Sequence, residues 1–182
     1  MDNFSFSIIS GNQLSAEDLE SVNRAKATEW DLQPMSENHL SKNSFALLKD
    51  SNGRILSQCE LIPIEGGKLD RKSHPILGIG GIIAHTKGLG YGKILMENVV
   101  NHLRASDTIG LGFAGNDVIG FYEKCGFISD HSSLKRFVHQ DGRLTITNTT
   151  EECVFYLDSK NSLMKKTLSR SGNILLPRDP DW

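Results

Sequence analysis

Residues 4–8 begin the chain with an alternating pattern. Phenylalanine or isoleucine alternates with serine there, which is the period of a strand with one buried face. Ser15 is followed by acidic residues, the signal of a helix N-cap, and predicts a helix that runs to about Trp30 and is stopped by Pro34. A short second helix is predicted after Ser36.

A hairpin is predicted next along the chain. Residues 44–49 and 54–64 have strand-like patterns, and the Asp-Ser-Asn-Gly sequence of residues 50–53 is typical of a tight turn. Residues 66–75 are mostly polar and predict a loop.

The most informative stretch is residues 76–104. An apolar run ends near Ala84, glycines follow at Gly88, Gly90 and Gly92, and an amphipathic helix comes last. Glycine lets the backbone turn sharply and approach a ligand closely. The first turn of a helix leaves N–H groups without partners, and its dipole favours an anion. This strand, glycine turn and helix therefore predict a phosphate-binding site.

Two lysines, Lys87 and Lys93, flank the turn and add positive charge. The Walker A pattern of nucleotide-binding loops does not fit, because Gly92-Lys93 is followed by Ile94, which offers no hydroxyl for Mg²⁺. The phosphate ligand is therefore expected to belong to another class.

Shorter elements are predicted in the second half of the chain. Residues 108–113 form a short strand, and residues 117–124 form a helix with Asn116 as its N-cap. Gly126 stands where glycine is favoured just past a helix end. Another strand is predicted from Phe127 onward.

The remainder of the chain mixes polar and apolar segments. Residues 130–148 are polar, with a hairpin predicted around residues 141–142, and residues 154–157 are the last clear strand. Residues 162–170 predict a short helix, and the tail, residues 177–182, contains prolines that exclude helix or central strand. Helices and strands do not alternate throughout, so the pattern predicts a mixed α/β domain.

Composition limits the possible functions. The chain has 182 residues, of which 38% are apolar and 23% charged, so a single globular domain over residues 1–182 is predicted. The net charge of −2 creates no strong field for nucleic acid or an anionic membrane, and no stretch approaches the ~20 apolar residues of a membrane span. No secretory signal begins the chain, and three widely separated cysteines predict buried reduced thiols, no metal site and a cytoplasmic protein.

The spacing Lys87-x-x-Gly90-x-Gly92 resembles the (Q/R)-x-x-G-x-(G/A) loop of the GNAT superfamily of acyl-CoA-dependent N-acetyltransferases. Lysine here replaces the usual arginine or glutamine. In that family the loop amides hold the pyrophosphate of coenzyme A, so the resemblance implies acetyl-CoA as the cofactor. The residues implied to contact it are Ile82, Ile83, Ala84, Lys87, Gly88, Leu89, Gly90, Tyr91, Gly92 and Lys93.

Residues 116–127 resemble a second segment of the same superfamily, a capped helix that reads x-x-F-Y-x-K-x-G-F. In the family, the tyrosine at the place of Tyr122 sits near the coenzyme A sulfur and often protonates the leaving thiolate. The resemblance implies Tyr122 as the catalytic acid, and Asn116, Phe121 and Lys124 as coenzyme A contacts. The alternative interpretation of Tyr122 is a half-buried helix aromatic whose O–H is hydrogen-bonded.

The chemistry needs oxyanion donors and an acceptor for a proton. An amine that attacks a thioester carbonyl forms an oxyanion, which backbone N–H groups can stabilise, and the resemblance places them at residues 82–84. Many relatives carry a glutamate in the strand before the loop, where this chain has Gly80 or Gly81. A water chain without a dedicated base is one alternative. The other candidate bases are Glu60, His74, His85, Asp117 and the C-terminal carboxylate of Trp182.

The acidic tail suggests an acceptor. Asp179, Asp181 and the terminal carboxylate of Trp182 make an anionic end, similar to the aminoglycoside 2′-N-acetyltransferase branch, in which an acidic C-terminus meets a polycationic sugar. This similarity implies that Asp181 and Trp182 bind the acceptor, and Glu60 is a further candidate for acceptor binding. The alternative is a frayed terminus without a role.

Two other functions compete with acetyl transfer. Gly110-x-Gly112-x-x-Gly115 formally matches the dinucleotide fingerprint, with Asp130 about twenty residues further on. A catalytically silent, coenzyme A-binding sensor or interaction module would fit the missing strand carboxylate.

The two motifs stand in the order that the superfamily shows. They imply the GNAT acyl-CoA N-acyltransferase fold, a central mixed, mostly antiparallel sheet flanked by helices. The implied function is transfer of an acetyl group from acetyl-CoA to an amine of a small-molecule or peptide acceptor. We expect no nucleic-acid or membrane partner, and a monomer or homodimer.

Overall fold

The computed structural model describes residues 4–64, 68–69, 72–140, 145–147 and 152–177. The chain forms two compact units, each made of two separate stretches. The first is Met1–Ile62 with Ile79–Val99, and the second is Pro63–Gly78 with Val100–Trp182. That residues 1–182 act as a single domain stays a prediction.

Strands and helices of the first unit follow the expected order. They are β1 (Ser5–Ser10), a 3-10 turn (Gly11–Gln13), α1 (Ala16–Trp30), α2 (Glu37–Lys42), β2 (Ser44–Lys49), β3 (Ile55–Pro63), β6 (Ile76–Ala84) and α3 (Tyr91–Ala105). The last residue of β3, the first three of β6 and the last six of α3 fall in the second unit.

Helices α1 and α2 begin where the sequence predicts. The hydroxyl of Ser15 accepts the backbone N–H of Asp18 at 3.1 Å, and Ser36 caps α2 in the same way. The predicted end of α1 at Trp30 is confirmed, but its cause is different. Asp31 adopts a left-handed conformation with φ 54° and its N–H donates to a carbonyl of the last turn, so α1 ends before Pro34.

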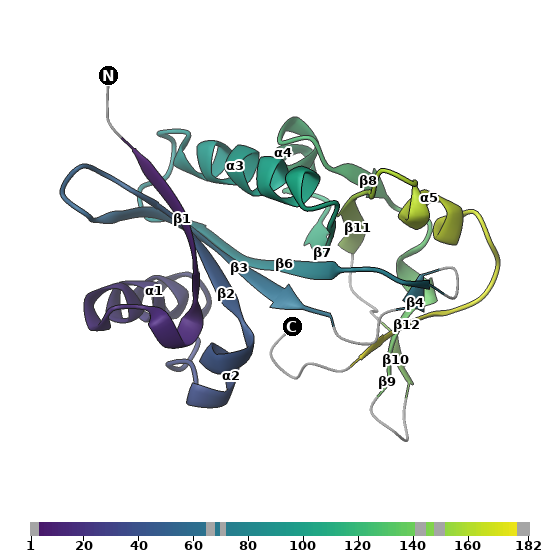
Figure 1. Cartoon of the computed structure of the whole chain (residues 1–182), viewed down its shortest axis with the longest axis horizontal. Coiled ribbons are helices and arrows are strands. Elements are labelled where there is room, and N and C mark those ends of the chain that lie inside the picture. The colour runs from purple at the N-terminus through teal and green to yellow at the C-terminus, as the bar shows by residue number, and fades with distance from the viewer. Residues whose placement is uncertain (1–3, 65–67, 70–71, 141–144, 148–151, 178–182) are drawn as a thin grey trace. The chain divides into compact units, whose positions relative to one another are not determined.

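The two faces of β3 meet different helices. The Ser57 hydroxyl donates to the carbonyl of Tyr91 at the start of α3, whereas Glu60 contacts Lys26 of α1. An odd residue spacing places side chains on opposite faces of a strand, so α1 and α2 cover one face of β1–β3 and α3 the other (Figure 1). The buried cluster between these helices and the sheet contains Val22 of α1, Leu40 of α2, Phe45 and Leu47 of β2, and Ile55 of β3.

Strand β6 carries one extra residue opposite β3. The N–H of Ile64 donates to Ile76, and the N–H of His85 donates to Leu56. Leu56 and Ile64 are eight positions apart, whereas Ile76 and His85 are nine apart, so the two antiparallel strands match only if β6 contains a bulge. Gly81, with φ 57°, adopts the left-handed conformation that such a bulge favours.

The second unit contains shorter elements. They are β4 (Lys68–Leu69), β5 (Lys72–Ser73), β7 (Ile109–Gly115), α4 (Ile119–Lys124), β8 (Ile128–Asp130), a 3-10 turn (Leu134–Arg136), β9 (Phe137–Gln140), β10 (Thr145–Thr147), β11 (Glu152–Leu157), α5 (Leu163–Leu168) and β12 (Ile174–Pro177). Its core packs apolar residues of β7, β11 and α5, among them Leu111, Val154 and Met164.

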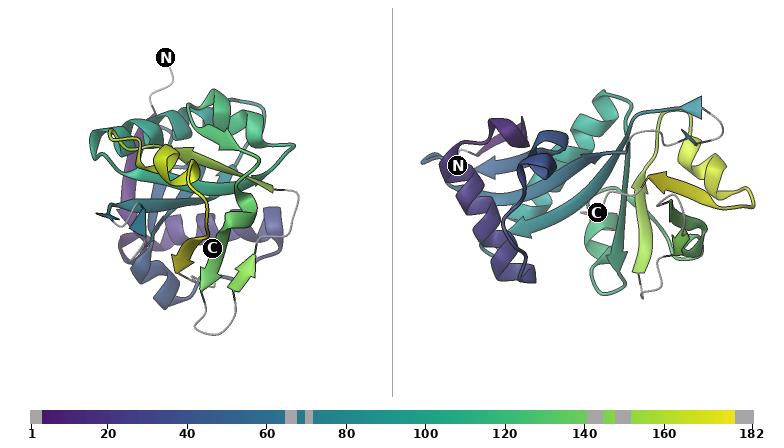
Figure 2. Two further views of the ribbon diagram at one scale, coloured as in Figure 1. Left: turned by 90° about the vertical axis from the view of Figure 1, so that its right-hand side faces the viewer. Right: turned by 90° about the horizontal axis from the view of Figure 1, so that it is seen from below.

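The structure confirms one of the sequence predictions for this unit and corrects two others. The hairpin is confirmed, since β9 and β10 pair antiparallel with Gln140 opposite Thr145, although its tip lies outside the described residues. The loop predicted for residues 66–75 is corrected, because β4 and β5 form a small antiparallel pair there. The last strand is β12 rather than β11, and it runs parallel beside β9 (Figure 2).

The main sheet has seven strands in the hydrogen-bonded order β1-β2-β3-β6-β7-β11-β8. Strands β6 and β7 pair in parallel over Ile76–Gly78, while the pairs β1–β2, β2–β3, β7–β11 and β11–β8 are antiparallel. The predicted mixed, mostly antiparallel sheet with flanking helices is therefore confirmed. Within the described part of the chain, every helix is too short or too polar to cross a membrane.

Candidate functional site

The glycine turn joins β6 to α3 in the first unit. Gly88 and Gly90 have φ angles of 83° and 79°, a conformation that glycine adopts without strain. The carbonyl of Gly90 accepts the N–H of Ile94 at 3.1 Å and so begins the helical hydrogen bonding. No atom lies within 4 Å of the Cβ positions of either glycine, which leaves open space above this backbone.

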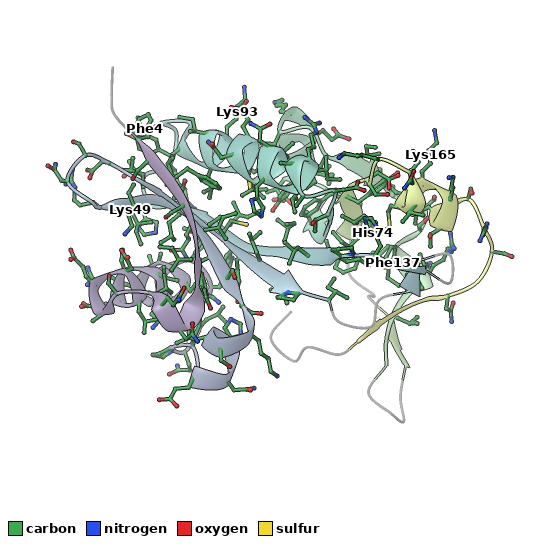
Figure 3. All side chains as sticks on the ribbon, viewed as in Figure 1. Phe4, Lys49, His74, Lys93, Phe137 and Lys165 are labelled. Carbon is green, nitrogen blue, oxygen red and sulfur yellow. The ribbon has the colours of Figure 1, made fainter. Side chains whose placement is uncertain are left out.

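Charges around the turn favour an anion. The first turn of α3 contains no acidic residue, and its N–H groups lack helical partners. Lys93 projects outward from this turn (Figure 3), with a side chain that is 57% exposed and 3.7 Å from Glu97. Lys87 is also exposed, but its Nζ lies 2.6 Å from the Glu29 carboxylate at the end of α1. Backbone donors, open space and Lys93 fit the pyrophosphate of coenzyme A.

The predicted oxyanion donors lie at the end of β6. Ile83 is buried, and Ile82 and Ala84 are half-buried. They directly follow the bulge at Gly81, and a bulge re-aims the backbone groups beside it. Bulges are frequent next to active sites for that reason. The geometry of β6 is therefore compatible with the role expected for its three last residues.

Tyr122 lies in the second unit on α4, in a cluster of aromatic rings. Its ring stacks on Phe155 with centroids 3.9 Å apart and an interplanar angle of 15°, and it meets Phe121 and Phe127 edge-on. The predicted helix end is confirmed, because Gly126 has φ 97° and the N–H of Phe127 donates back to the Tyr122 carbonyl. The position of the tyrosine ring is thus fixed by packing.

The predicted N-cap of this helix is wrong. Helix α4 begins at Ile119, with Val118 at the cap position and no side-chain cap. Asn116 lies earlier, in a turn closed by the N–H of Val118 on the Gly115 carbonyl. Asn116 and Lys124 are exposed, and Phe121 is half-buried, so these expected coenzyme A contacts lie around α4, within the same unit as Tyr122.

Glu60 lies in a buried cluster of polar groups in the first unit. Lys26 Nζ donates to its Oε2 at 3.1 Å, and Asn43 Nδ2 donates to its Oε1 at 2.9 Å. The His39 ring contacts the same Oε1. A Cβ added to Gly81 would stand 3.4 Å from Glu60 Oε2. The carboxylate from β3 therefore occupies the space beside the β6 position where many relatives carry a glutamate.

This environment stabilises the ionised form of Glu60. Burial raises the pKa of its carboxyl group, but the hydrogen bond from His39 and the positive charge of Lys26 outweigh burial, and the pKa lies below the ordinary 4.5. A carboxylate that already accepts three donors and binds a proton weakly is a poor general base. Glu60 fits a structural role better than the base or acceptor-binding role expected for it.

His85 directly follows β6 in the same unit. Its ring Nε2 lies 2.9 Å from Oε1 of Gln58, and Gln58 is only 1% exposed. Burial lowers the pKa of the imidazole below its ordinary 6.5, so the ring is neutral at pH 7. His85 thus combines a fixed orientation with an uncharged ring.

The remaining site residues predicted from the sequence lie elsewhere in the structure or outside the described residues. The ring of His74 contacts the carbonyl of Asp107 at 2.7 Å, and Asp117 is exposed. Asp181 and Trp182 lie outside the described residues. The glycines of the dinucleotide pattern lie inside β7, where the residues from Gly110 to Gly115 pair with β11, instead of in a strand-to-helix turn. The geometry that a dinucleotide fingerprint requires is absent from this part of the described chain.

Sequence reasoning missed the partners that surround these candidates. Lys26, His39 and Asn43 come from α1, α2 and the residue after α2, and spacing along the chain gives no sign that they meet. The available signal was on β3, where Gln58 and Glu60 place polar side chains at alternate positions between Leu56 and Ile62. Polar residues on the buried face of a strand need partners, so this pattern predicts a polar cluster without naming its members.

Comparison with known families gives a match over much of the chain. The model of the acetyltransferase (GNAT) family matches residues 13–127. The uncharacterized N-acetyltransferase ycf52 of Porphyra purpurea is 47% identical over 51 residues, which are 27% of this chain and 29% of that protein. The chain thus matches less than a third of the length of this curated relative.

Solved structures show the same arrangement of elements. ElaA from Escherichia coli has a TM-score of 0.60 at 15% identity, covering 86% of this chain and all of that one. The GNAT family N-acetyltransferase YhbS from Escherichia coli, solved with CoA, has a TM-score of 0.61 at 11% identity and covers 98% of this chain and 91% of that one. At these identities the likeness concerns the fold.

Proposed function

The chain belongs to the acetyltransferase (GNAT) family, and from this we propose that it transfers an acyl group from acyl-CoA to a primary amine. Acetyl-CoA is the proposed donor, and a small molecule or peptide the proposed acceptor. The thioester of the donor supplies an activated acyl carbon. The protein supplies binding, orientation and proton transfer.

One observation carries the proposal, namely the glycine turn before α3. Its left-handed residues, Gly88 and Gly90, leave space above the backbone, and the helix that follows has no acidic residue in its first turn. A helix N-terminus with these features binds an anion through backbone donors. The same residues match the loop that holds a pyrophosphate in the family.

We also propose residues that stabilise the oxyanion and that protonate the leaving sulfur. We assign the amides of Ile82, Ile83 and Ala84 to oxyanion stabilisation, because they follow the β6 bulge. Tyr122 is assigned as the proton donor to the leaving sulfur, since its aromatic neighbours fix the ring. A tyrosine, with an ordinary pKa near ~10, can donate to a thiolate while staying un-ionised at pH 7.

The phosphate-binding turn is tested by Gly90→Glu. The new side chain would place a negative charge in the space proposed for the pyrophosphate, and we expect no measurable binding of acetyl-CoA by calorimetry. Gly53→Glu is the matched control, because Gly53 has φ 81° and equally open surroundings in the β2–β3 turn. Both variants strain the backbone alike, so equal loss of binding in both, or in neither, would refute the assignment.

The acid role is tested by Tyr122→Phe. Removal of the hydroxyl should lower turnover of acetyl-CoA about 10²-fold or more, with little change in its dissociation constant. Tyr156→Phe in the neighbouring strand β11 is the control for loss of a tyrosine hydroxyl from the same unit. Full activity of Tyr122→Phe would remove this residue from the mechanism. Binding of acetyl-CoA by the wild type without thiol release for any amine would instead favour the silent binding module.

A further inference from the structure

His85 is held at two points in the first unit. Its backbone N–H donates to the carbonyl of Leu56 at 2.9 Å, and its ring Nε2 lies 2.9 Å from Oε1 of Gln58. Gln58 is almost fully buried on β3, so it has little freedom to move. The imidazole orientation is therefore set by a rigid strand, as a catalytic side chain requires.

Gln58 also selects one tautomer of the neutral ring. An amide oxygen accepts hydrogen bonds and cannot donate them, so the Nε2 atom of His85 carries the hydrogen. The other ring nitrogen, Nδ1, then keeps its lone pair and can accept a proton. The residue is half-buried.

The charged groups on the same face of β3 and in the loop after His85 are paired with one another. On the same face of β3, the negative charge of Glu60 is balanced by Lys26 and contacted by His39. In the loop after His85, Lys87 is paired with Glu29. Burial is the cause that lowers the pKa of His85, and the charged groups around it are neutralised in pairs.

Among the candidate bases whose position is described, His85 is the best suited to neutral pH. A base works most efficiently when its pKa lies near the working pH. Burial lowers the pKa of His85 from its ordinary 6.5, so its ring is a neutral proton acceptor at pH 7. The pKa of the Glu60 carboxyl group lies below 4.5, and this carboxylate is already engaged by Lys26, His39 and Asn43. The ring of His74 is occupied by the Asp107 carbonyl.

We propose that His85 is the proton acceptor for the amine, and that Gln58 is the residue that positions it. This inference rests on the proposed acyl transfer. The amine nitrogen forms a bond to the acyl carbon and gives one proton to His85 Nδ1. The carbon–sulfur bond breaks, and the sulfur leaves with the electron pair and takes up one proton. The proton on His85 passes to solvent, so the products are the amide and the free thiol.

The test compares three variants with the wild type. His85→Gln removes the titrating ring but keeps a side chain that can donate to Gln58. Gln58→Glu keeps the hydrogen bond and adds a negative charge that favours the imidazolium. His74→Gln is the matched control, because it makes the same substitution at another half-buried histidine that is bonded to a carbonyl.

Two readouts are measured for each protein. Thiol release from acetyl-CoA is followed from pH 5 to 9 with the fastest amine among spermidine, kanamycin, lysine and a peptide with a free N-terminus. The amine's own ionisation is common to all variants and cancels in their comparison. NMR titration of the His85 ring gives its pKa without any need for turnover.

We expect His85→Gln to lower kcat about 10²-fold or more, while acetyl-CoA binding and the His74→Gln control stay unchanged. Gln58→Glu should move the acid limb of kcat to higher pH, in step with the NMR pKa of His85. The inference is overturned if kcat is unchanged in His85→Gln, or if Gln58→Glu shifts the NMR pKa of His85 without shifting the acid limb of kcat. Either result would not contradict the proposed acyl transfer. Wild-type protein that releases no thiol with any of the four amines overturns both.

Discussion

Two of the ion pairs on helix α1 differ in their surroundings. Lys26 pairs with Glu60 where the side chains are only 11% and 5% exposed. One turn later, Glu29 pairs with Lys87 of the glycine loop, and these side chains are 33% and 73% exposed. Buried pairs are costly to break, because one charge is left without water or a partner. Exposed pairs contribute little and exchange readily for other ions.

This difference separates structure from ligand binding in the first unit. The buried pair, with His39 and Asn43, ties α1 and α2 to β3 at the level of the β6 bulge. The exposed pair involves a lysine that the family resemblance assigns to a pyrophosphate-binding loop. We infer that Glu29 competes with the ligand for Lys87, whereas Glu60 serves the fold and is not available to a ligand.

The largest effect is expected for Glu60→Gln. The variant leaves Lys26 buried without a counter-charge, and we expect the free energy of unfolding to fall by about 3–5 kcal/mol. Urea denaturation measures this change. Glu20→Gln, which removes an exposed pair with Arg24 on the same helix, should change stability by less than about 0.5 kcal/mol. A similarly small effect for Glu60→Gln would show that burial does not make the Lys26–Glu60 pair costlier to break than the Glu20–Arg24 pair.

The pH dependence of stability should also depend on Glu60. The pKa of this group is lower in the folded protein than the 4.5 of the unfolded chain, so it contributes stability above pH 4.5 that is lost as the pH falls below that value. Unfolding of wild type and Glu60→Gln, followed from pH 7 to 3, should show a smaller acid loss in the variant. Parallel curves would contradict the assignment of an ionised Glu60.

The smallest effect concerns Glu29→Gln. Release of Lys87 from an exposed pair, worth about 0.2–1 kcal/mol, should tighten acetyl-CoA binding by about 1.4–5-fold at low salt. The gain should shrink as ionic strength rises, because salt screens the pair in the wild type. Glu20→Gln controls for the change in net charge. Weaker binding in Glu29→Gln would mean that Glu29 orients Lys87 for the ligand instead of competing for it.

Local signals in the sequence predicted most of the elements. The caps at Ser15 and Ser36, the strand over residues 44–49 and the turn at Gly53 each depend on residues within a few positions. The glycine turn and α3 were also predictable, because a strand, a glycine cluster and an amphipathic helix follow one another directly. These interactions are local, so spacing along the chain is sufficient to find them.

Long-range arrangements could not be predicted in the same way. Glu60 meets Lys26 and Asn43 across 34 and 17 positions of the chain, and neither distance has a periodic signal. The bulge at Gly81 depends on the register between β3 and β6. The prediction of Asn116 as the N-cap of α4 was wrong because asparagine favours a turn as well as a helix start. Tertiary packing decides between the two.

Thermal unfolding with and without acetyl-CoA tests the central claim, that this protein binds acyl-CoA at the glycine turn. Acetyl-CoA at about 100 times its dissociation constant should stabilise the wild type by about 2.7 kcal/mol. NAD and ATP at the same concentration should leave the midpoint unchanged, and Gly90→Glu should not respond to acetyl-CoA. A wild-type midpoint that acetyl-CoA does not raise would contradict the account.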